Sequence, residues 1–226
     1  MRVCDIRDHF RSELSKENFT TDKTGMKTIE MIGASFIADE PSIFGEVNKQ
    51  YVEDELVWYT SQSTNIKDIW GDRKSGKAPQ AWEYSANEHG EINSNYGLLI
   101  YSKKYFEQYN KVLRELSEVN PDSRRASMIY QRPSIWHEYK ENGKNDFICT
   151  NAVTYYIRNG QLHCVVQMRS NDVVFGYKND YAWQRHVLEL LRTDLYYGGM
   201  HVEVGDIHWQ VQNLHVYERH FDLVND

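Results

Sequence analysis

The chain has 226 residues and a formal net charge of −7, with 40% hydrophobic and 26% charged residues. This length suits one domain with a substantial core, and no linker-like segment divides it, so we predict a single domain over residues 1–226. The acidic balance argues against a large nucleic-acid groove, because a protein that neutralises many phosphates usually has a basic surface. We therefore expect no direct DNA binding.

The sequence shows neither a membrane span nor a secretion signal. No stretch approaches the roughly 18 consecutive apolar residues of a spanning helix. The N-terminal segment MRVCDIRDHF lacks the apolar centre of a signal peptide. The three cysteines, Cys4, Cys149 and Cys164, have no spacing typical of a disulfide framework or a zinc knuckle. We expect a reduced protein that stays in the cytoplasm and does not associate with membranes.

The first half of the chain alternates between strand-like and helical patterns. Residues 28–37 are rich in β-branched and apolar residues, which predicts a strand or a bulged pair of strands around Gly33. Residues 46–61 carry apolar side chains near helical spacing. Residues 72–90 are the most loop-like part of the chain. In residues 105–116, apolar side chains recur at intervals of three and four residues, which predicts an amphipathic helix.

In the second half of the chain, the spacing of apolar residues is mainly typical of β-strands. We expect strands at 126–131, 152–158, 161–168 and 206–217. Asn159 and Gly160 are a strong signal for a two-residue hairpin. Residues 181–197 return to helical spacing and are followed by two glycines that end the helix. The sequence therefore predicts an α+β fold in which helices cover one face of a mixed sheet.

One segment, QMRSNDVVFGYKNDYAW at 167–183, carries the most informative motif. Its Arg169, Ser170, Asp172, Val173 and Gly176 match the run R-S-C-D-V-F-L-G of the thymidylate synthase family, which this chain resembles. Further blocks in the same order as in that family are DKTGMKTIEMIGASF, ELVWYTSQSTNIKDI, PDSRR, EVGDIHW and LHVY. The resemblance implies a thymidylate synthase-like fold whose sheet packs its other face against an identical subunit, so we expect a homodimer.

Cys149, in the segment DFICTN, is the nucleophile that the resemblance implies. Carbon 5 of a pyrimidine is a poor nucleophile until a group adds to carbon 6, and a thiolate adds and leaves reversibly. A lone cysteine is more often a small buried hydrophobe. Cys149, however, lies between the DSRR and RSND motifs as in the family, whereas Cys4 and Cys164 match no family position. Glu55 matches the glutamate of the family's ELLWF and is the implied general acid/base, although most helical glutamates face solvent.

The resemblance also implies a phosphate pocket. Arg169 is expected beside both the cysteine and the substrate phosphate, where its charge favours the thiolate. Ser170, Lys23 and, from the partner subunit, Arg124 and Arg125 complete the pocket. Two adjacent arginines are more often a solvated surface pair, but the four-residue match to DSRR favours phosphate binding, for which arginine forks are well suited.

Asp180 stands where the synthases have the asparagine that reads uracil. An amide satisfies the carbonyl and ring N–H of uracil, whereas cytosine offers an amino donor and a bare ring nitrogen. A carboxyl group can accept from the amino group and, if it carries a proton, donate to nitrogen 3. A simpler reading is that Asp180 starts the following helix. The aspartate makes the chain resemble the branch of the family that acts on dCMP.

The remaining site residues follow from the same resemblance. Trp82, Tyr96, Asp172 and Gly176 match or line the folate site. For the substrate, the matching residues are Asn171 and Asp172 beside the base, and His215 and Tyr217 at the deoxyribose 3′-hydroxyl. His215 and His220 lie five residues apart with no third ligand in view, so we predict no metal.

The implied activity is the transfer of a one-carbon unit from 5,10-methylenetetrahydrofolate to carbon 5 of dCMP. The expected product is 5-hydroxymethyl-dCMP, for modified phage DNA made in the host cytoplasm. Alternatives are a hydroxymethylase acting on dUMP or CMP, and a pyrimidine nucleotide C5-methylase. A different class is a catalytically silent member that binds nucleotides or RNA as a regulator. The cysteine, glutamate and arginines in the expected places argue against that class.

Overall fold

The computed structural model describes residues 1–22, 25–73 and 77–225. Lys23, predicted to bind phosphate, lies outside these residues. The chain forms two compact units, which we describe separately: unit 1 comprises Met1–Val47 and Thr154–Asp226, and unit 2 comprises Asn48–Val153. That the whole chain acts as a single domain stays a prediction.

The elements of unit 1 are α1 (Val3–Ser15), β1 (Thr20–Thr21), β2 (Lys27–Ile37), most of β4 (Thr150–Arg158), β5 (Gln161–Asp172), α7 (Gly176–Tyr197), β6 (Glu203–Tyr217), η5 (Glu218–His220) and α8 (Phe221–Asn225). Those of unit 2 are α2 (Lys49–Ser61), η1 (Ile66–Arg73), α3 (Gln80–Ser85), α4 (Tyr96–Tyr101), η2 (Lys103–Tyr105), α5 (Gln108–Arg114), the π-helical turn η3 (Glu115–Val119), β3 (Ser127–Ile129), α6 (Ile135–Glu138) and η4 (Glu141–Gly143).

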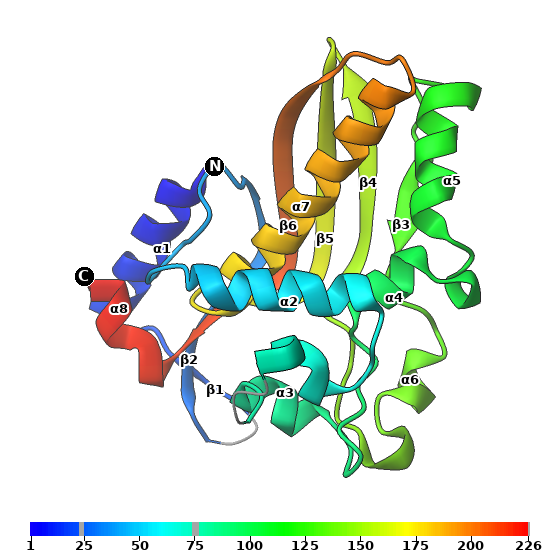
Figure 1. Cartoon of the computed structure of the whole chain (residues 1–226). Coiled ribbons are helices and arrows are strands. Elements are labelled where there is room, and N and C mark those ends of the chain that lie inside the picture. The colour runs from blue at the N-terminus through cyan, green and yellow to red at the C-terminus, as the bar shows by residue number, and fades with distance from the viewer. Residues whose placement is uncertain (23–24, 74–76, 226) are drawn as a thin grey trace. The chain divides into compact units, whose positions relative to one another are not determined.

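The described strands form one mixed sheet in the order β1-β2-β6-β5-β4-β3. The unit boundary falls inside β4. Strand β2 pairs with β6 antiparallel, whereas β5 pairs with β6 in parallel. In the first part of β5 every second side chain is buried, from Leu162 through Cys164 and Val166 to Met168, and α7 packs on this strand (Figure 1). The α+β fold with a mixed sheet is therefore confirmed.

The turn between β4 and β5 is the predicted two-residue hairpin. Asn159 and Gly160 have φ values of 52° and 74°. A turn with positive φ at both central residues matches the twist of the flanking strands, and asparagine followed by glycine adopts it at low cost. The local sequence thus favours this connection.

Several predicted boundaries were wrong. The helix expected at 105–116 starts only at Gln108, because Phe106 and Glu107 adopt positive φ values of 70° and 49°. The loop expected at 72–90 contains α3. The helix expected from residue 181 begins earlier, at Gly176, so Asp180 lies inside α7 and does not start it. The sequence also gave no prediction for α1, although Val3, Ile6 and Phe10 are buried on one face of it.

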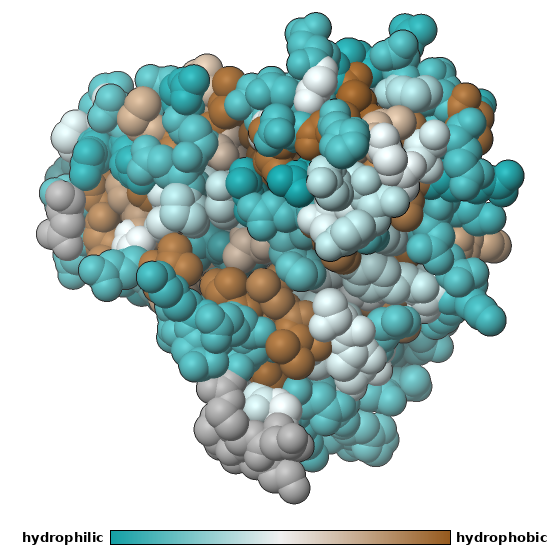
Figure 2. All heavy atoms as spheres, turned by 45° about the horizontal axis from the view of Figure 1, so that its top comes forward, coloured by the Kyte–Doolittle hydropathy of each residue, from teal (hydrophilic) through white to brown (hydrophobic). Residues whose placement is uncertain are grey.

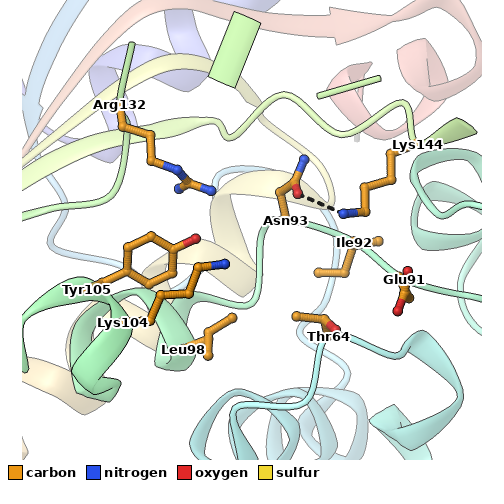
Figure 3. Close-up of a pocket in the computed structure, with 9 residues that line it drawn as sticks. All are labelled: Thr64, Glu91, Ile92, Asn93, Leu98, Lys104, Tyr105, Arg132 and Lys144. Carbon is orange, nitrogen blue, oxygen red and sulfur yellow. Dashed lines mark hydrogen bonds between the residues drawn. The ribbon is translucent and has the colours of Figure 1, made fainter. Parts of the chain in front are cut away.

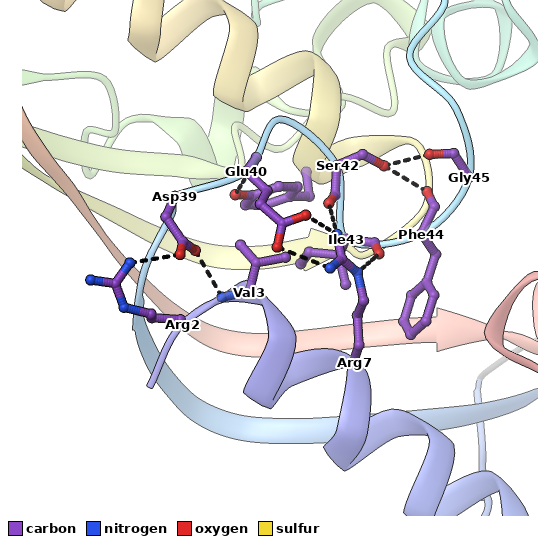
Figure 4. A network of polar contacts seen from close by, with 10 residues as sticks. Arg2, Val3, Arg7, Asp39, Glu40, Ser42, Ile43, Phe44 and Gly45 are labelled. Carbon is purple, nitrogen blue, oxygen red and sulfur yellow. Dashed lines mark hydrogen bonds and ion pairs between the residues drawn. The ribbon is translucent and has the colours of Figure 1, made fainter. Parts of the chain in front are cut away.

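Helix α1 is fixed to the segment that follows β2 by two arginines (Figure 4). Arg7 donates to both carboxylate oxygens of Glu40, at 3.0 and 2.7 Å, and to the carbonyl oxygen of Ile43 at 2.6 Å. Arg2 forms an ion pair of 2.8 Å with Asp39. The Glu40 carboxylate raises the pKa of Arg7 further above its ordinary value. A bidentate contact of this kind holds the helix in one orientation.

The face of the protein shown in Figure 2 is mostly polar. Figure 2 shows a face on which hydrophilic side chains predominate, with hydrophobic atoms gathered in a few patches. Among the described residues, exposed large hydrophobic side chains include Ile32, Phe106, Trp136 and Tyr197. No helix in the described part of the chain has both the length and the apolar character needed to cross a membrane.

Candidate active site

Eight predicted site residues gather at one end of unit 1. They lie at the carboxyl ends of the parallel strands β5 and β6 and at the start of α7: Arg169, Ser170, Asn171, Asp172, Gly176, Asp180, His215 and Tyr217. Asp172 is directly opposite His215 in the ladder. Side chains at the ends of adjacent parallel strands meet at the same edge of a sheet, which is where open α/β sheets commonly bind ligands.

Asp180 is held by a buried asparagine. The Asn171 side chain, 3% exposed, donates from Nδ2 to Asp180 Oδ2 at 2.8 Å and accepts from the indole N–H of Trp209 at 3.3 Å. Because an indole N–H can only donate, the oxygen of the amide faces Trp209 and the NH₂ group faces Asp180. Any proton on the Asp180 carboxyl group therefore belongs on its other oxygen, Oδ1. The sequence placed Asn171 at the substrate, and this positioning contact was missed.

Asp172 and Gly176 shape the turn into α7. The Asp172 carboxylate accepts from the backbone N–H groups of Val174 and Phe175, both at 3.0 Å. A Cβ atom added at Gly176 would lie 3.0 Å from Asn171 Nδ2, which is tighter than an ordinary contact. Glycine therefore lets the start of the helix approach the asparagine that holds Asp180.

His215 is 9% exposed, and burial lowers its pKa, so the ring is neutral at neutral pH. Its Nδ1 lies 3.4 Å from the carbonyl oxygen of Asn213, which can only accept, so the hydrogen belongs on Nδ1. Nε2 is then left as an acceptor. Tyr217 packs edge-on against His215, with ring centroids 5.0 Å apart, and Arg219 lies over the Tyr217 ring.

The Glu55 carboxyl group of unit 2 is buried and bonded to two aromatic side chains. Glu55 Oε1 accepts from the Tyr51 hydroxyl at 2.6 Å and from Trp82 Nε1 at 3.3 Å, and the same indole N–H lies 3.0 Å from the Tyr51 oxygen. Burial raises the pKa of Glu55 to about 7, against the two hydrogen bonds, which lower it. The common expectation for a helical glutamate, a solvent-facing charge, is wrong here. A carboxyl group with this pKa can both take and give a proton near neutral pH.

Cys149 is partly buried and directly precedes β4. Its neighbour Thr150 is fully buried and donates to the hydroxyl oxygen of Tyr96 at 3.0 Å. Asp146, three residues before the cysteine, accepts from the backbone N–H groups of Asn93 and Ser94 at 2.6 and 2.7 Å. These contacts fix the cysteine segment to the segment that leads into Tyr96.

Asp146 is a residue that the sequence reading missed. Its carboxyl group is buried and also accepts from the Ser94 hydroxyl at 2.7 Å. Burial raises its pKa, while the hydrogen bonds act in the opposite direction. The sequence offers one signal for Asp146. It is a polar residue close to the expected nucleophile, in a segment with little helical or strand pattern. Tyr51 was also missed as a partner of Glu55, although the two are four apart on one helix, which is the spacing of facing side chains.

The two arginines of the DSRR motif are exposed. Arg125 donates from Nε to Glu115 at 2.9 Å, yet 75% of its side chain stays accessible. Ser123 bonds the same Glu115 oxygen at 2.7 Å, so the glutamate orients the turn that presents both arginines. The contact with a partner subunit stays a prediction.

A second polar cluster, in unit 1, was not anticipated. His163, Asp206 and His208 have potential ligand atoms within 4.8 Å of one another. The backbone N–H of Asp206 donates to His163 Nδ1 at 2.9 Å, so the lone pair of that nitrogen is already engaged. The expectation that the protein uses no metal stays a prediction.

The chemistry of unit 2 fits a flat aromatic cofactor. Trp82 is half-buried and stands edge-on to the buried Trp58, with ring centroids 5.1 Å apart, while its N–H is fixed by Glu55. An indole held at its polar edge presents a rigid apolar surface on which a heteroaromatic ring can stack.

Comparison with known proteins shows the family of the chain. The sequence model of the family described as thymidylate synthase matches residues 7–226. The chain is 51% identical over 227 residues to the deoxycytidylate 5-hydroxymethyltransferases of Enterobacteria phages T4 and T2, covering 100% of this chain and 90% of each relative. It is 25% identical over 228 residues to a thymidylate synthase of Francisella tularensis subsp. holarctica, covering 93% of this chain and 79% of that protein. The chain belongs to the thymidylate synthase family.

Proposed function

We propose that this enzyme hydroxymethylates dCMP at carbon 5 and uses 5,10-methylenetetrahydrofolate as the one-carbon donor. The observation that carries the proposal is Asp180, an aspartate where the synthases have asparagine, held by Asn171 on one oxygen. Identity of 51% over the whole chain to two phage deoxycytidylate 5-hydroxymethyltransferases supports it. A phage would use the product to build modified DNA.

Cys149 starts the reaction by adding its thiolate to carbon 6 of cytosine, which makes carbon 5 nucleophilic. Asp180 accepts from the amino group at carbon 4 and donates a proton from Oδ1 to nitrogen 3 as negative charge develops there. The His215 ring is neutral and carries no hydrogen on Nε2, so Nε2 accepts from the 3′-hydroxyl of deoxyribose. Tyr217 lies at the same hydroxyl.

The bound folate supplies a carbon at the oxidation level of formaldehyde. Trp82 would hold its rings, Tyr96, itself stacked on Tyr59, would line the same region, and Asp172 and Gly176 would border them. After carbon 5 has taken up this carbon, it gives up its hydrogen as a proton and the bond to tetrahydrofolate breaks, which leaves an exocyclic methylene group on the base. Glu55 then orders the water that attacks this group and accepts its proton, and Cys149 leaves carbon 6 as the thiolate. A carboxyl group with a pKa of about 7 is suited to this step.

The substrate phosphate is bound by Arg169 and Ser170, with Lys23 and the partner's arginines at positions 124 and 125 completing the pocket. We infer a homodimer because Arg124 and Arg125 are exposed in the single chain. Arginine forks give two parallel bonds to phosphate oxygens and so favour a monophosphate held in one orientation.

The function is tested by incubating the protein and the folate with dCMP, dUMP and CMP separately and identifying the products by mass spectrometry. We expect 5-hydroxymethyl-dCMP together with tetrahydrofolate. A 5-methyl product with dihydrofolate would show that hydride, rather than water, completes the reaction. A product from dUMP alone would contradict the reading of Asp180.

Cys149→Ser tests the assignment of Cys149 as the nucleophile. It should abolish turnover together with the exchange of the carbon 5 hydrogen of dCMP into water, because an alkoxide is not available at neutral pH and leaves poorly. Cys164→Ser is the comparison, since Cys164 lies in the core of β5 and matches no family position. Exchange that persists in Cys149→Ser would remove the cysteine from the mechanism.

A further inference from the structure

A separate pocket in unit 2 gathers three basic side chains (Figure 3). Its cavity is about 180 Å³ and is lined by Thr64, Glu91, Ile92, Asn93, Leu98, Lys104, Tyr105, Arg132 and Lys144. This volume lies below the roughly 300–1,000 Å³ of pockets for drug-sized ligands. It suits a group of a few heavy atoms, and none of the residues predicted for the active site lines it.

Arg132 is the main unexplained group. Its Nη2 pairs with Glu138, and its guanidinium lies over the Tyr105 ring, 4.8 Å from the centroid. Its Nε and Nη1 atoms are buried and have no hydrogen-bond partner among the described residues. Buried donors in folded proteins are nearly always satisfied, so these two N–H groups leave the guanidinium with positive charge that its contact with Glu138 only partly offsets.

The neighbouring charges favour an anion in the pocket. In Figure 3 the nitrogens of Lys104 and Arg132 point toward the centre of the pocket, and Lys144 reaches in from the opposite side. Lys144 donates to Asn93 Oδ1 at 3.2 Å. The Asn93 amide is fixed because its Nδ2 donates to the carbonyl oxygens of Glu138 and Asp146.

The carboxylates nearby are already engaged. Glu91 accepts from Asn87 Nδ2 at 2.9 Å, and Glu138 is paired with Arg132, which lowers the Glu138 pKa. Three cations against these two carboxylates leave a positive excess around the cavity. Three cationic donors and a tyrosine hydroxyl converging on a small space form a site suited to tetrahedral oxyanions.

We propose that this pocket binds a phosphate group, in addition to the phosphate of the substrate. The group is either free inorganic phosphate or the phosphate chain of a nucleotide. Lys104 and Lys144 bind it from two sides, and the Arg132 guanidinium adds positive charge at the wall of the pocket. The site is independent of the proposed activity.

Calorimetric titration with inorganic phosphate tests the proposal, at fixed ionic strength and with dCMP at saturation to block the substrate site. We expect phosphate to bind to the wild type and to bind about tenfold more weakly to Lys104→Ala and to Lys144→Ala, the loss of one charge-assisted hydrogen bond. Lys103→Ala is the matched control, an exposed lysine next to Lys104 that does not line the pocket, and its affinity should not change.

Equal phosphate affinity in all four proteins overturns the proposal, as does complete loss of phosphate binding in the presence of dCMP. Melting temperatures in phosphate-free buffer check folding, and they should not fall in the lysine variants because removing a cation relieves repulsion. Titration with ATP distinguishes the two sources. Displacement of phosphate by ATP would identify a nucleotide phosphate chain, and a lack of displacement would identify the free ion.

Discussion

Glu55 lies on α2 with its carboxyl group 5% exposed and bonded to Tyr51 and Trp82. No cation pairs with it in the hydrogen bonds and ion pairs of the described residues. Burial therefore dominates, and it raises the pKa from its ordinary value of 4.5 to about 7. Burial of this carboxyl group therefore lowers the free energy of unfolding by an amount that depends on pH.

We predict that Glu55→Gln makes the protein more stable at pH 8 and less active. Between pH 4.5 and about 7 the folded chain keeps a proton that the unfolded chain has lost, so wild-type stability falls as pH rises across this interval. The glutamine variant has no carboxyl group to ionise at this position, so it keeps the free energy of unfolding that the wild type loses, on the order of 2–3 kcal/mol at pH 8. Urea unfolding at pH 5 and pH 8 measures the difference, and kcat should fall by roughly 10²–10⁴.

Glu53→Gln is the control for this prediction, because Glu53 is an exposed glutamate on the same helix. It should change neither the pH dependence nor kcat. If wild type and Glu55→Gln lose stability in parallel between the two pH values, Glu55 is ionised in the folded chain throughout and the general acid/base assignment fails.

We predict that Asp180→Asn weakens catalysis on dCMP and raises it on dUMP. To suit uracil, the new side chain places its oxygen, in the position of Oδ1, at the ring N–H and its NH₂ group at the carbonyl of carbon 4, and it gives up the hydrogen bond from Asn171 Nδ2. Each mismatched buried polar group costs about 1–3 kcal/mol, or roughly tenfold to a hundredfold in the ratio of kcat/KM for the two nucleotides. Kinetics with both substrates over a range of pH separates a lost proton donor from lost binding. An unchanged ratio would show that Asp180 does not read the base.

At the scale of elements, the placement of Tyr96 depends on one glycine. Helices α2 and α4 approach so closely that a Cβ atom at Gly97 would lie 1.8 Å from the backbone oxygen of Tyr59. Asn95 caps α4 by accepting from the Leu98 N–H, and its amide donates to the carbonyl oxygen of Trp58 at 3.1 Å. The backbones of α2, which carries Glu55, and α4, which carries Tyr96, are therefore in direct contact.

We predict that Gly97→Ala destabilises the protein by about 3 kcal/mol or more, because the overlap is with backbone that no rotamer change can clear. Chemical unfolding with a spectroscopic probe measures it. Gly198→Ala is the control, with an ordinary φ of −75° and nearest atoms at 3.3 Å, and should cost less than about 1 kcal/mol. A small effect at Gly97 would mean that the two helices can separate without loss.

At the scale of the whole molecule, we predict that the active site needs two subunits. Cys149→Ser and Arg125→Ala should each be inactive. Mixed under conditions of subunit exchange, they should recover roughly a quarter of wild-type activity per subunit, because half of the dimers are mixed and each of these has one intact site. Activity assays before and after exchange measure the recovery. Lack of recovery, with exchange demonstrated by mass spectrometry, would place Arg125 outside the partner's site.

The sequence by itself determined the long strands β2, β4, β5 and β6, the hairpin at Asn159 and Gly160, and the family, because period-two patterns, turn residues and motif spacing are local properties. It could not determine that Glu55 is buried, that Asn171 holds Asp180, or that two buried N–H groups of Arg132 have no partner among the described residues. Each of these depends on residues distant in the chain. Burial and hydrogen-bond partners arise only when segments pack, so the tertiary structure alone decided the protonation and orientation of the groups that carry the chemistry.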